Sequence, residues 1–237
     1  MKADAGQPLG QPLAGRHALV TAGPTWEAID PVRYIANHSS GRQGYAIAQA
    51  LADLGARTTL VSGPTNLAPP SGVDTINITS ARDMQAACND SLPADIAVCV
   101  AAVADWHVAN ETTSKVKKNG GAPPTLNLVE NPDILAGLCA QGNLRPELVV
   151  GFAAETDHVV DYARAKRDRK GCDWIVANDV SPSTGIMGGD NNTVHLITAD
   201  GVEDWAEGSK DAVGMQLAQR IADHFADTAP ETGAGDA

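Results

Sequence analysis

The residues best suited to bind an anion follow the first predicted strand. The segment Thr21–Thr25 opens a long loop, and Asn37–Gly44 closes it where a helix is expected to begin. Within that closing segment, Ser39–Gly41 would place free backbone N–H groups and hydroxyls at a helix N-terminus, which attracts phosphates and carboxylates. The glycines do not have the G-x-G-x-x-G spacing of a dinucleotide site. The alternative interpretation is structural, because the same residues would also serve to cap a helix that follows an elaborate loop.

A carboxylate and an aromatic ring follow two further predicted strands. After the strand at 95–100, the small residues Ala101 and Ala102 would let a ligand approach the backbone closely, and Asp105 offers a carboxylate to a hydroxyl or a metal ion. Phe152 ends the strand at 148–153, where its ring could stack on a base. A turn-forming aspartate and a core phenylalanine are the ordinary alternatives.

Two groups of lysines could neutralise phosphates. The first is Lys115–Lys118, in a polar stretch that continues into Gly120–Gly121 and is typical of a mobile basic loop. The second is Lys166 with Lys170, which lie four residues apart and therefore share a helix face. Two ammonium groups on one face suit a polyphosphate, although solvated charges or pairs with carboxylates would produce the same pattern.

The remaining polar motifs say less by themselves. Asn131 is expected to cap a helix whose first residue is Pro132. Ala177–Val180 follows another strand and precedes the glycine-rich stretch 185–189. The six histidines lack a metal-binding spacing, and His38 has the strongest claim to a role because it lies in the anion loop. No serine stands in a G-x-S-x-G pattern, so a hydrolase nucleophile elbow is not expected.

The elements that must position these residues alternate between strand and helix. Apolar and β-branched runs predict strands at 17–21, 58–61, 74–78, 95–100, 148–153 and 174–177, and helical spacing predicts helices at 43–54, 80–90, 156–170 and 210–225. Segments 193–198 and 202–205 flank Ala-Asp-Gly, which predicts a β-hairpin. We therefore expect an α/β fold, a three-layer Rossmann-like domain with a mostly parallel sheet and a small β-hairpin extension. Ligands of such domains bind beyond the carboxyl ends of the strands, where the motifs fall.

Composition limits the class of protein. The 237 residues are 43% hydrophobic but only 4% aromatic, so small aliphatic side chains must fill the core, and a net charge of −12 argues against a nucleic-acid-binding domain. Neither a membrane helix nor a secretory signal is recognisable, so a cytoplasmic location is expected. The four cysteines form no C-x-x-C pair and are expected to be reduced and structural. Residues 1–15 are predicted to be a linker or disordered leader and residues 228–237 a flexible tail.

Together the motifs resemble the synthetase domain of bacterial phosphopantothenoylcysteine synthetases, which would occupy residues 16–227. The carriers are Ala22–Thr25, Asp30–Ile35, Asn37–Gly41, Ala101–Asp105, Lys115–Lys118, Asn131–Ile134, Gly151–Thr156 and Ala177–Val180. The resemblance implies that the carboxylate of 4′-phosphopantothenate attacks the α-phosphorus of CTP, giving an acyl-cytidylate and pyrophosphate. The amine of L-cysteine then attacks the acyl carbon and releases CMP. Mg²⁺ is expected to bridge the phosphates, with its protein ligands unknown.

The resemblance also assigns roles to single residues. Asn37 matches an asparagine at the acyl centre, and Lys115 matches a lysine tied to the nucleotide and to the cysteine-dependent half-reaction. The implied CTP-binding positions are Ala101, Asp105, Lys115, Pro132, Asp133, Ile134, Leu135, Phe152, Lys166 and Lys170. The implied substrate- and phosphate-binding positions are Gly23, His38, Ser39, Ser40, Gly41 and Ala102. The K-x-K-K loop indicates the CTP-using rather than the ATP-using type.

Partners follow from the same resemblance. In this family the basic loop covers the site across a dimer interface, so a homodimer is expected. In many bacteria the domain follows a flavin-dependent phosphopantothenoylcysteine decarboxylase, which would be a fused or separate partner here. No nucleic acid or membrane partner is expected. Trp26 stands where Arg or His is common, and Trp106 stands where Tyr is common, which affects details of substrate packing.

Two other functions compete with this hypothesis. An NAD(P)-dependent oxidoreductase of the same sheet class would use a Tyr-x-x-x-Lys pair, and Tyr162 with Lys166 has that spacing. The glycine pattern that such an enzyme needs after its first strand is missing. A nucleotide sensor without catalysis would keep the phosphate loops but would have no use for Asn37 or for a lysine lid.

Overall fold

The strands and helices follow the predicted alternation closely. The computed structural model describes residues 10–117, 125–181 and 189–228. Its strands are β1 (His17–Ala22), β2 (Trp26–Asp30), β3 (Arg33–Ala36), β4 (Arg57–Ser62), β5 (Val73–Asn77), β6 (Ile96–Cys99), β7 (Trp106–Val108), β8 (Leu128–Glu130), β9 (Leu148–Glu155), β10 (Trp174–Asp179), β11 (Asn191–Asn192), β12 (Val194–Ile197), β13 (Val202–Asp204) and β14 (Gly208–Ser209). Its helices are α1 (Arg42–Asp53), α2 (Ala81–Asp90), α3 (Ile134–Cys139), the 3₁₀ turn η1 (Gly142–Leu144), α4 (Val159–Lys170) and α5 (Lys210–Asp227).

The central sheet confirms the predicted α/β class. Its order is β13-β12-β10-β9-β6-β1-β4-β5. Six neighbouring strands of this sheet pair in parallel, namely β5, β4, β1, β6, β9 and β10. At one edge, β12 and β13 add an antiparallel hairpin, as expected from their Ala-Asp-Gly turn. Numbered along the chain, the parallel strands run 3-2-1-4-5-6, the order of doubly wound nucleotide-binding sheets. The order reverses between β1 and β6, which places a ligand crevice at the carboxyl ends of those two strands.

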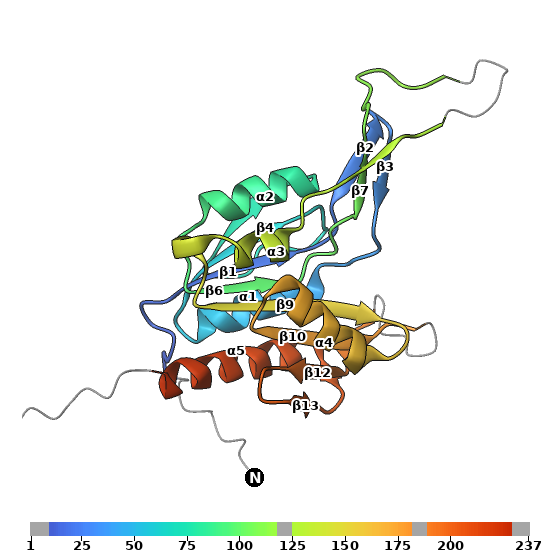
Figure 1. Cartoon of the computed structure of the whole chain (residues 1–237). Coiled ribbons are helices and arrows are strands. Elements are labelled where there is room, and N and C mark those ends of the chain that lie inside the picture. Colours follow the sequence, from blue (N-terminus) through green and yellow to red (C-terminus); the bar gives the residue numbers. More distant parts are fainter. Residues whose placement is uncertain (1–9, 118–124, 182–188, 229–237) are drawn as a thin grey trace, which may run out of the picture.

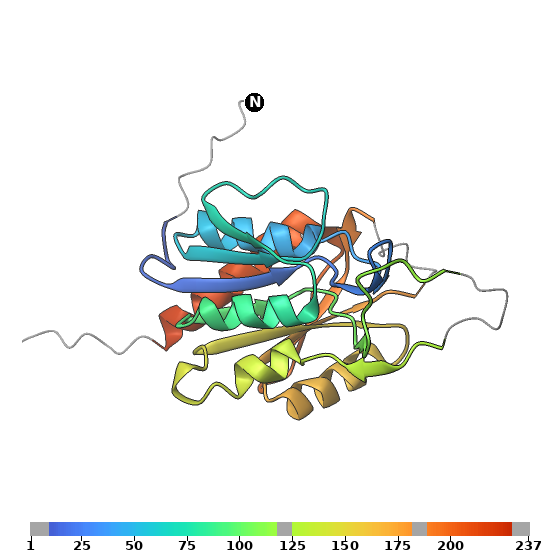
Figure 2. The same ribbon diagram turned by 90° about the horizontal axis from the view of Figure 1, so that it is seen from above.

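Helices cover both faces of the sheet, which gives the expected three layers (Figure 1). On one face, α1 and α5 pack against β1, β6, β9 and β10. On the other face, α2, α3 and α4 contribute Met84, Leu138 and Ala163 to a second apolar cluster. Figure 2 shows the sheet from above. Strands covered on both faces need continuous apolar runs, and this explains why every residue of β1 is buried.

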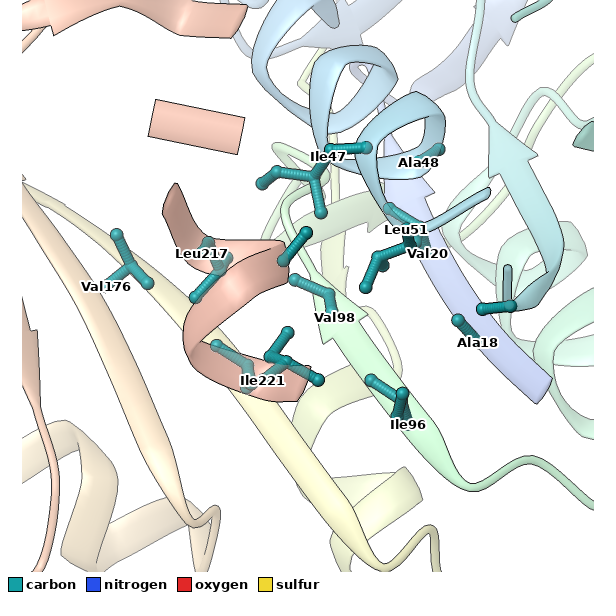
Figure 3. Packing of buried hydrophobic residues seen from close by; sticks show 14 of the residues in the cluster. Ala18, Val20, Ile47, Ala48, Leu51, Ile96, Val98, Val176, Leu217 and Ile221 are labelled. Atoms are coloured by element: carbon teal, nitrogen blue, oxygen red, sulfur yellow. The ribbon is translucent and has the colours of Figure 1, made fainter. Parts of the chain in front are cut away.

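The larger core lies between α1, α5 and the sheet. Figure 3 shows Ile47 and Leu51 of α1 and Leu217 and Ile221 of α5 directed toward Val98 and its neighbours on the strands. Each of these side chains is fully buried, so each contributes roughly 1.5–3 kcal/mol of transfer free energy to folding. This core holds the N-termini of α1 and α5 against the carboxyl edge of the sheet.

The contact between α1 and α5 depends on one small residue. A Cβ added to Gly214 of α5 would lie 2.9 Å from the carbonyl carbon of Ala46 and 3.1 Å from the amide nitrogen of Ile47 in α1. Because these are backbone atoms, Gly214→Ala should lower the free energy of unfolding by about 1–3 kcal/mol, measured by urea titration. Gly137→Ala in α3 is the matched control, since its Cβ would meet nothing within 4 Å and helix propensity favours alanine. A Gly214→Ala protein with the free energy of unfolding of the wild type would contradict this close packing of α1 on α5.

Two antiparallel hairpins stand beside the central sheet and were not predicted. The pairs β2–β3 and β7–β8 form them, and we call the four strands together the hairpin arm. The sequence pattern predicts that residues 26–36 belong to a long loop. The structure instead stacks Trp26 of β2 on Tyr34 of β3, with ring centroids 4.3 Å apart. Figure 1 shows the arm extending from one end of the domain.

The predicted leader and tail lie only partly within the described residues. Leu13 is fully buried, and its amide donates to the carbonyl of Leu54, so the packed part of the chain begins before Arg16. Residues 1–9 and 229–237 lie outside the described residues. Within the described ranges, no helix is long and apolar enough to cross a membrane.

Candidate functional site

A cavity of about 780 Å³ opens at the carboxyl edge of the sheet, at the reversal point between β1 and β6. Thr21 and Gly23 reach it from β1, and Cys99 with Ala101 reaches it from β6. It is lined by every predicted site residue except Lys115, namely Asn37, Ala101, Asp105, Pro132, Asp133, Ile134, Leu135, Phe152, Lys166, Lys170, Gly23, His38, Ser39, Ser40, Gly41 and Ala102. The motifs that follow separate strands therefore meet in one place.

The anion loop ends in an open helix N-terminus. Gly41 is the N-cap of α1 and has a left-handed backbone with φ 77°, which only glycine adopts readily. No side chain caps the helix, since glycine has none to offer, and the hydroxyl of Ser39 accepts a hydrogen bond from the amide of Gly41 at 3.3 Å. The first-turn N–H groups of α1 have no intrahelical acceptor and face the cavity edge, so they can donate to an anionic oxygen.

Hydrogen bonds between loops fix the position of the site. The amide of Ala102 donates to the carbonyl of Gly23 at 2.9 Å, and the amide of Ala104 donates to the Thr25 hydroxyl at 3.0 Å. The side-chain amide Nδ2 of Asn37 donates to the carbonyl of Val103 at 3.0 Å. Asn37 is exposed at the cavity edge, so its carboxamide oxygen remains available to a ligand. The loops after β1 and β6 are thus held as one rim.

The start of α3 differs from the prediction. Asp133, not Asn131, is the N-cap, and its carboxylate accepts the amide of Ala136 at 2.9 Å. The Oδ1 of Asn131, the atom that would cap the helix, is buried and accepts no hydrogen bond, while its Nδ2 donates to the carbonyl of Ala104 and its backbone amide donates to the carbonyl of Asp105. The correction moves the helix start from Pro132 to Ile134. Asn131 instead joins the α3 loop to the loop after β6.

Lys166 and Lys170 both reach the cavity from α4, but each already has a partner. Lys166 donates from Nζ to the carbonyl of Phe152 at 2.7 Å, and burial lowers the pKa of its ammonium group. Lys170 forms an ion pair with Asp133. Burial raises the pKa of that carboxyl, but the hydrogen bonds from Lys170 and from the amide of Ala136 outweigh it, so the pKa is lowered overall. The helix begins at Val159 rather than near Thr156.

Lys115 is the predicted site residue that the structure does not bring to the cavity. It is exposed and lies in the connection between β7 and β8 of the hairpin arm. Its neighbour Val116 donates its amide to Asp30 at 3.1 Å and accepts from Arg33 at 2.9 Å, so this part of the basic loop is fastened to the turn between β2 and β3. Lys118 and Gly120–Gly121 lie outside the described residues, as do residues 185–188 of the glycine-rich stretch.

Two cationic residues that line the cavity were missed by sequence analysis. Arg42 begins α1 and pairs with Asp190, and Lys210 begins α5. Burial lowers the pKa of the Lys210 ammonium group, and the nearby charge of Arg42 lowers it further. Two cations held close together favour an anion between them. No local pattern could have found this pair, because only the packing of α1 on α5 brings it together.

A chain of side-chain amides supports this cationic corner. Nδ2 of Asn178 donates to Oδ1 of Asn192 at 3.1 Å, and Nδ2 of Asn192 donates to Oε1 of Gln43 at 3.2 Å. Nε2 of Gln43 then donates to the carbonyl of Lys210 at 3.0 Å. Asn178 and Asn192 are both buried, and all four residues line the cavity. The chain joins β10, β11, α1 and α5 around the wall of the site.

Several expected alternatives find little support in the geometry. Tyr162 is half exposed and does not line the cavity with Lys166, so the two do not form an oxidoreductase pair. Trp106 lines the cavity, whereas Trp26 does not. The four cysteines are free, as predicted. Cys99 lies at the cavity wall, but burial raises the pKa of its thiol, which disfavours the nucleophilic thiolate.

Comparison with known proteins matches nearly the same region of the chain as the predicted domain at residues 16–227. The profile of the DNA/pantothenate metabolism flavoprotein C-terminal domain matches residues 13–225. The coenzyme A biosynthesis bifunctional protein CoaBC of Escherichia coli K12 is 46% identical over 210 residues, which are 87% of this chain and 52% of that protein. CoaBC of Haemophilus influenzae Rd is 42% identical over 219 residues, covering 92% of this chain and 54% of that protein. The chain therefore spans about half the length of these curated relatives.

Solved structures agree in fold. The crystal structure of the C-terminal domain of coenzyme A biosynthesis bifunctional protein CoaBC superposes with a TM-score of 0.78 at 36% identity and covers 92% of this chain and 100% of that one. The DNA/pantothenate metabolism flavoprotein of Streptococcus pneumoniae has a TM-score of 0.74 at 24% identity, covering 89% of this chain and 100% of that one. At that identity the likeness concerns the fold alone.

The fold and cavity define a doubly wound α/β domain with a crevice at its topological switch point that lysine and arginine side chains line. The chain belongs to the DNA/pantothenate metabolism flavoprotein C-terminal domain family. The family resemblance drawn from the ordered motifs is thereby confirmed.

Proposed function

We propose that this chain is a phosphopantothenate–cysteine ligase that uses CTP. The carboxylate of 4′-phosphopantothenate attacks the α-phosphorus of CTP, which forms an acyl-cytidylate and expels pyrophosphate. The amine of L-cysteine then attacks the acyl carbon, and CMP leaves with one former carboxylate oxygen. Activation is needed because a carboxylate is a poor electrophile, whereas a nucleotide ester supplies a good leaving group. We place this reaction in the cytoplasm.

One observation carries the proposal. In a chain that belongs to this family, the residues assigned by the ordered motifs line a single cavity at the switch point of the sheet, apart from Lys115. Helices on both faces of the sheet contribute cations to that cavity, Lys166 with Lys170 from α4 and Arg42 with Lys210 from α1 and α5. Two pairs of cations suit a reaction that brings together a nucleoside triphosphate and a phosphorylated acid. The open N-terminus of α1 adds backbone donors for an anion.

We assign a different role in the reaction to each group of residues. Lys166 and Lys170 neutralise charge on the nucleotide, and Phe152 supports its base. The donor and acceptor of the Asn37 carboxamide lie at the rim between the loops after β1 and β6, where the acyl group would sit. Positioning of anions and stabilisation of developing charge account for most of the catalysis that such a site can provide.

A magnesium ion fits this site only with help from the substrates. Among the described residues, no group of three or more histidine, cysteine, aspartate or glutamate side chains could hold a metal ion. Mg²⁺ commonly binds through one or two carboxylates together with phosphate oxygens and water. Asp105 and Glu130 line the cavity and are the carboxylates that could hold it. The ion would neutralise phosphate charge in the nucleotide.

A direct assay tests this function. The protein would be incubated with CTP, Mg²⁺, 4′-phosphopantothenate and L-cysteine, and pyrophosphate and CMP would be followed. We expect both products in equal amounts, with CMP dependent on cysteine. Absence of pyrophosphate under every condition would refute the ligase. A change in reduced-nicotinamide absorbance would favour the oxidoreductase, and CTP binding without turnover would favour the nucleotide sensor.

We further propose that the protein acts as a homodimer in which Lys115 enters the partner's cavity. Lys115 is exposed at the hairpin arm, away from the cavity of its own chain. The arm also carries large apolar side chains that are about half exposed, namely Val32, Tyr34, Trp106, Leu128 and Val129. Exposed apolar groups gathered on one feature are typical of an interface. A second copy would cover them and deliver the basic loop.

A charge on the arm should therefore separate the subunits. We expect Leu128→Glu to weaken dimerisation about a hundredfold and to lower activity in parallel, measured by sedimentation equilibrium and by CMP release. Leu144→Glu is the matched control, because Leu144 is equally exposed but lies in η1. A Leu128→Glu protein that stays dimeric, or a wild-type protein that is monomeric at assay concentration, would contradict the interface.

The relatives also suggest a partner activity. CoaBC is described as bifunctional, and this chain corresponds to about half of its length. We propose that the product of this chain passes to a flavin-dependent phosphopantothenoylcysteine decarboxylase, either on the same polypeptide or on a separate one. Addition of a purified decarboxylase should convert the product, with release of CO₂ that depends on cysteine and CTP.

A further inference from the structure

The end of β2 carries a buried carboxylate to which the reaction above gives no role. Asp30 is only 3% exposed, although Pro31, Val32 and Arg33, which follow it, are all exposed. The pairing of β2 with β3 shifts between Ala28 and Asp30, so β2 carries an extra residue there. Such a bulge redirects the side chains beside it, which accounts for a buried carboxylate next to exposed neighbours.

Asp30 accepts hydrogen bonds from its own turn and from the basic loop. Its Oδ1 accepts the backbone amide of Val32 at 3.0 Å. Its Oδ2 accepts Nε of Arg33 at 3.0 Å, Nη2 of the same guanidinium, and the backbone amide of Val116 at 3.1 Å. The hydrogen bond from Arg33 holds the pKa of the carboxyl far below its ordinary value, against the opposing effect of burial. The group is therefore an ionised carboxylate at neutral pH.

The peptide groups of Val116 are held on both sides by this ion pair. The N–H of Val116 donates to Oδ2 of Asp30, and its carbonyl accepts Nη2 of Arg33 at 2.9 Å. We call Asp30, Arg33 and Val116 the clasp. Hydrogen bonds to charged groups are about twice as strong as those between neutral groups, so the clasp is a firm attachment of the basic loop to the arm.

Lys115 lies between the clasp and a second attachment. On its N-terminal side, the amide of Thr112 donates to the carbonyl of Ile29 in β2 at 3.4 Å. On its C-terminal side, the next residue is Val116 of the clasp. The backbone around Lys115 is thus joined to β2 before and after this residue, whereas Lys115 itself is exposed.

We propose that Asp30 is a positioning residue for Lys115, acting through Arg33 and the backbone of Val116. This inference rests on the proposed function, because the position of Lys115 matters to catalysis only if the lysine takes part in the ligase reaction. A displacement of about 1 Å can lower a rate roughly a hundredfold. By fixing the backbone beside Lys115, the clasp sets where its ammonium group meets the substrates.

Hydrogen exchange tests the clasp without reference to activity. Protein labelled with ¹⁵N-valine would be studied by NMR, with the Val116 amide signal assigned through Val116→Ile. We expect Asp30→Asn to speed exchange of this amide about tenfold, because asparagine has one acceptor oxygen and no charge to hold the guanidinium and the amide together. Equal exchange rates of the Val116 amide in the wild-type and Asp30→Asn proteins would overturn the proposal.

Asp173→Asn is the matched control. Asp173 also accepts from an arginine and from a backbone amide, namely Arg145 at 3.0 Å and Val149 at 2.7 Å. These residues lie at the amino ends of β9 and β10, the opposite edge of the sheet from the cavity. The substitution weakens the same kind of network away from Lys115, so exchange at Val116 and turnover should both stay at the wild-type level.

A double-mutant cycle tests whether the clasp acts through Lys115. We expect Asp30→Asn to lower kcat about tenfold in the native background but less than about twofold when Lys115 is already glutamine. General damage would lower kcat by the same factor in both backgrounds, and that result would overturn the proposal. Sedimentation would check that Asp30→Asn keeps the assembly state of the wild type, since a loss explained by a change of assembly would also overturn it.

Two further results separate this proposal from the ligase itself. Wild-type turnover of Lys115→Gln would refute the part of this lysine in the proposed function, whereas an impaired Lys115→Gln beside a fully active Asp30→Asn would overturn the positioning role alone. If Asp30→Asn does not fold, Arg33→Lys decides, because lysine keeps the charge but cannot donate from two nitrogens. The same changes in exchange and kcat are expected there, and their absence would overturn the clasp.

Discussion

Asn37→Asp should lower turnover by about a hundredfold or more while the fold stays intact. Asn37 donates from Nδ2 to the carbonyl of Val103 at the rim of the cavity, where we place the acyl group. Aspartate removes that donor and adds a negative charge beside an anionic intermediate. Loss of one donor at a reacting centre typically lowers the rate by roughly 10²–10³.

The half-reaction that Asn37→Asp slows distinguishes a role at the acyl centre from general damage to the site. In a single turnover we expect Asn37→Asp to release pyrophosphate in proportion to active sites but to release CMP slowly after cysteine is added. Asn77→Asp makes the same chemical change at an exposed position on the edge strand β5 and should behave as wild type. Normal CMP release by Asn37→Asp would remove Asn37 from the acyl centre.

Lys115→Gln should reduce turnover by a similar factor with no change in thermal stability. The side chain is exposed and does not line the cavity of its own chain, so its loss disturbs no packing. Lys117→Gln, in the same loop, is the matched control and should have a much smaller effect. Equal activity of the Lys115→Gln and wild-type proteins would refute a role for this lysine.

Mixing the two inactive variants tests whether Lys115 acts on the partner's cavity. If subunits of Asn37→Asp and Lys115→Gln exchange at random, half of the dimers are mixed, and each mixed dimer holds one site with both native residues. About a quarter of wild-type activity should then return. Activity that stays at the level of the separate variants, despite confirmed subunit exchange, would place Lys115 in its own chain's site or outside any site.

The central sheet was predictable because its signals are local. Strands such as β1 and β9 are continuous apolar runs, and α1 and α5 show helical spacing over several turns. The hairpin arm was not predictable in the same way. Its strands are short, and β7 pairs with β8 across a polar stretch that gives no sign of the pairing. The stacking of Trp26 on Tyr34 becomes evident only in the structure.

The predicted site residues gather around one cavity for a related reason. Motifs at or near the carboxyl ends of parallel strands meet at one edge of the sheet, so Gly23, Ala101 and Phe152 come together whatever their separation in sequence. Phe152 itself lies within β9, which continues to Glu155 rather than ending at 153. Arg42 and Lys210 were missed because their proximity depends on the packing of α1 against α5. The N-cap of α3 is Asp133 rather than the predicted Asn131 for a similar reason. The side chain of Asn131 makes a tertiary contact instead, in which its Nδ2 donates to the carbonyl of Ala104.

The most direct test of the ligase follows an oxygen atom. 4′-Phosphopantothenate labelled with ¹⁸O in its carboxylate would be supplied with CTP, Mg²⁺ and L-cysteine, and the nucleotide product would be analysed by mass spectrometry. Attack on the α-phosphorus requires that one ¹⁸O from the carboxylate appears in CMP. Label in inorganic phosphate with CDP as the nucleotide product, or CMP without label, would contradict the acyl-cytidylate route.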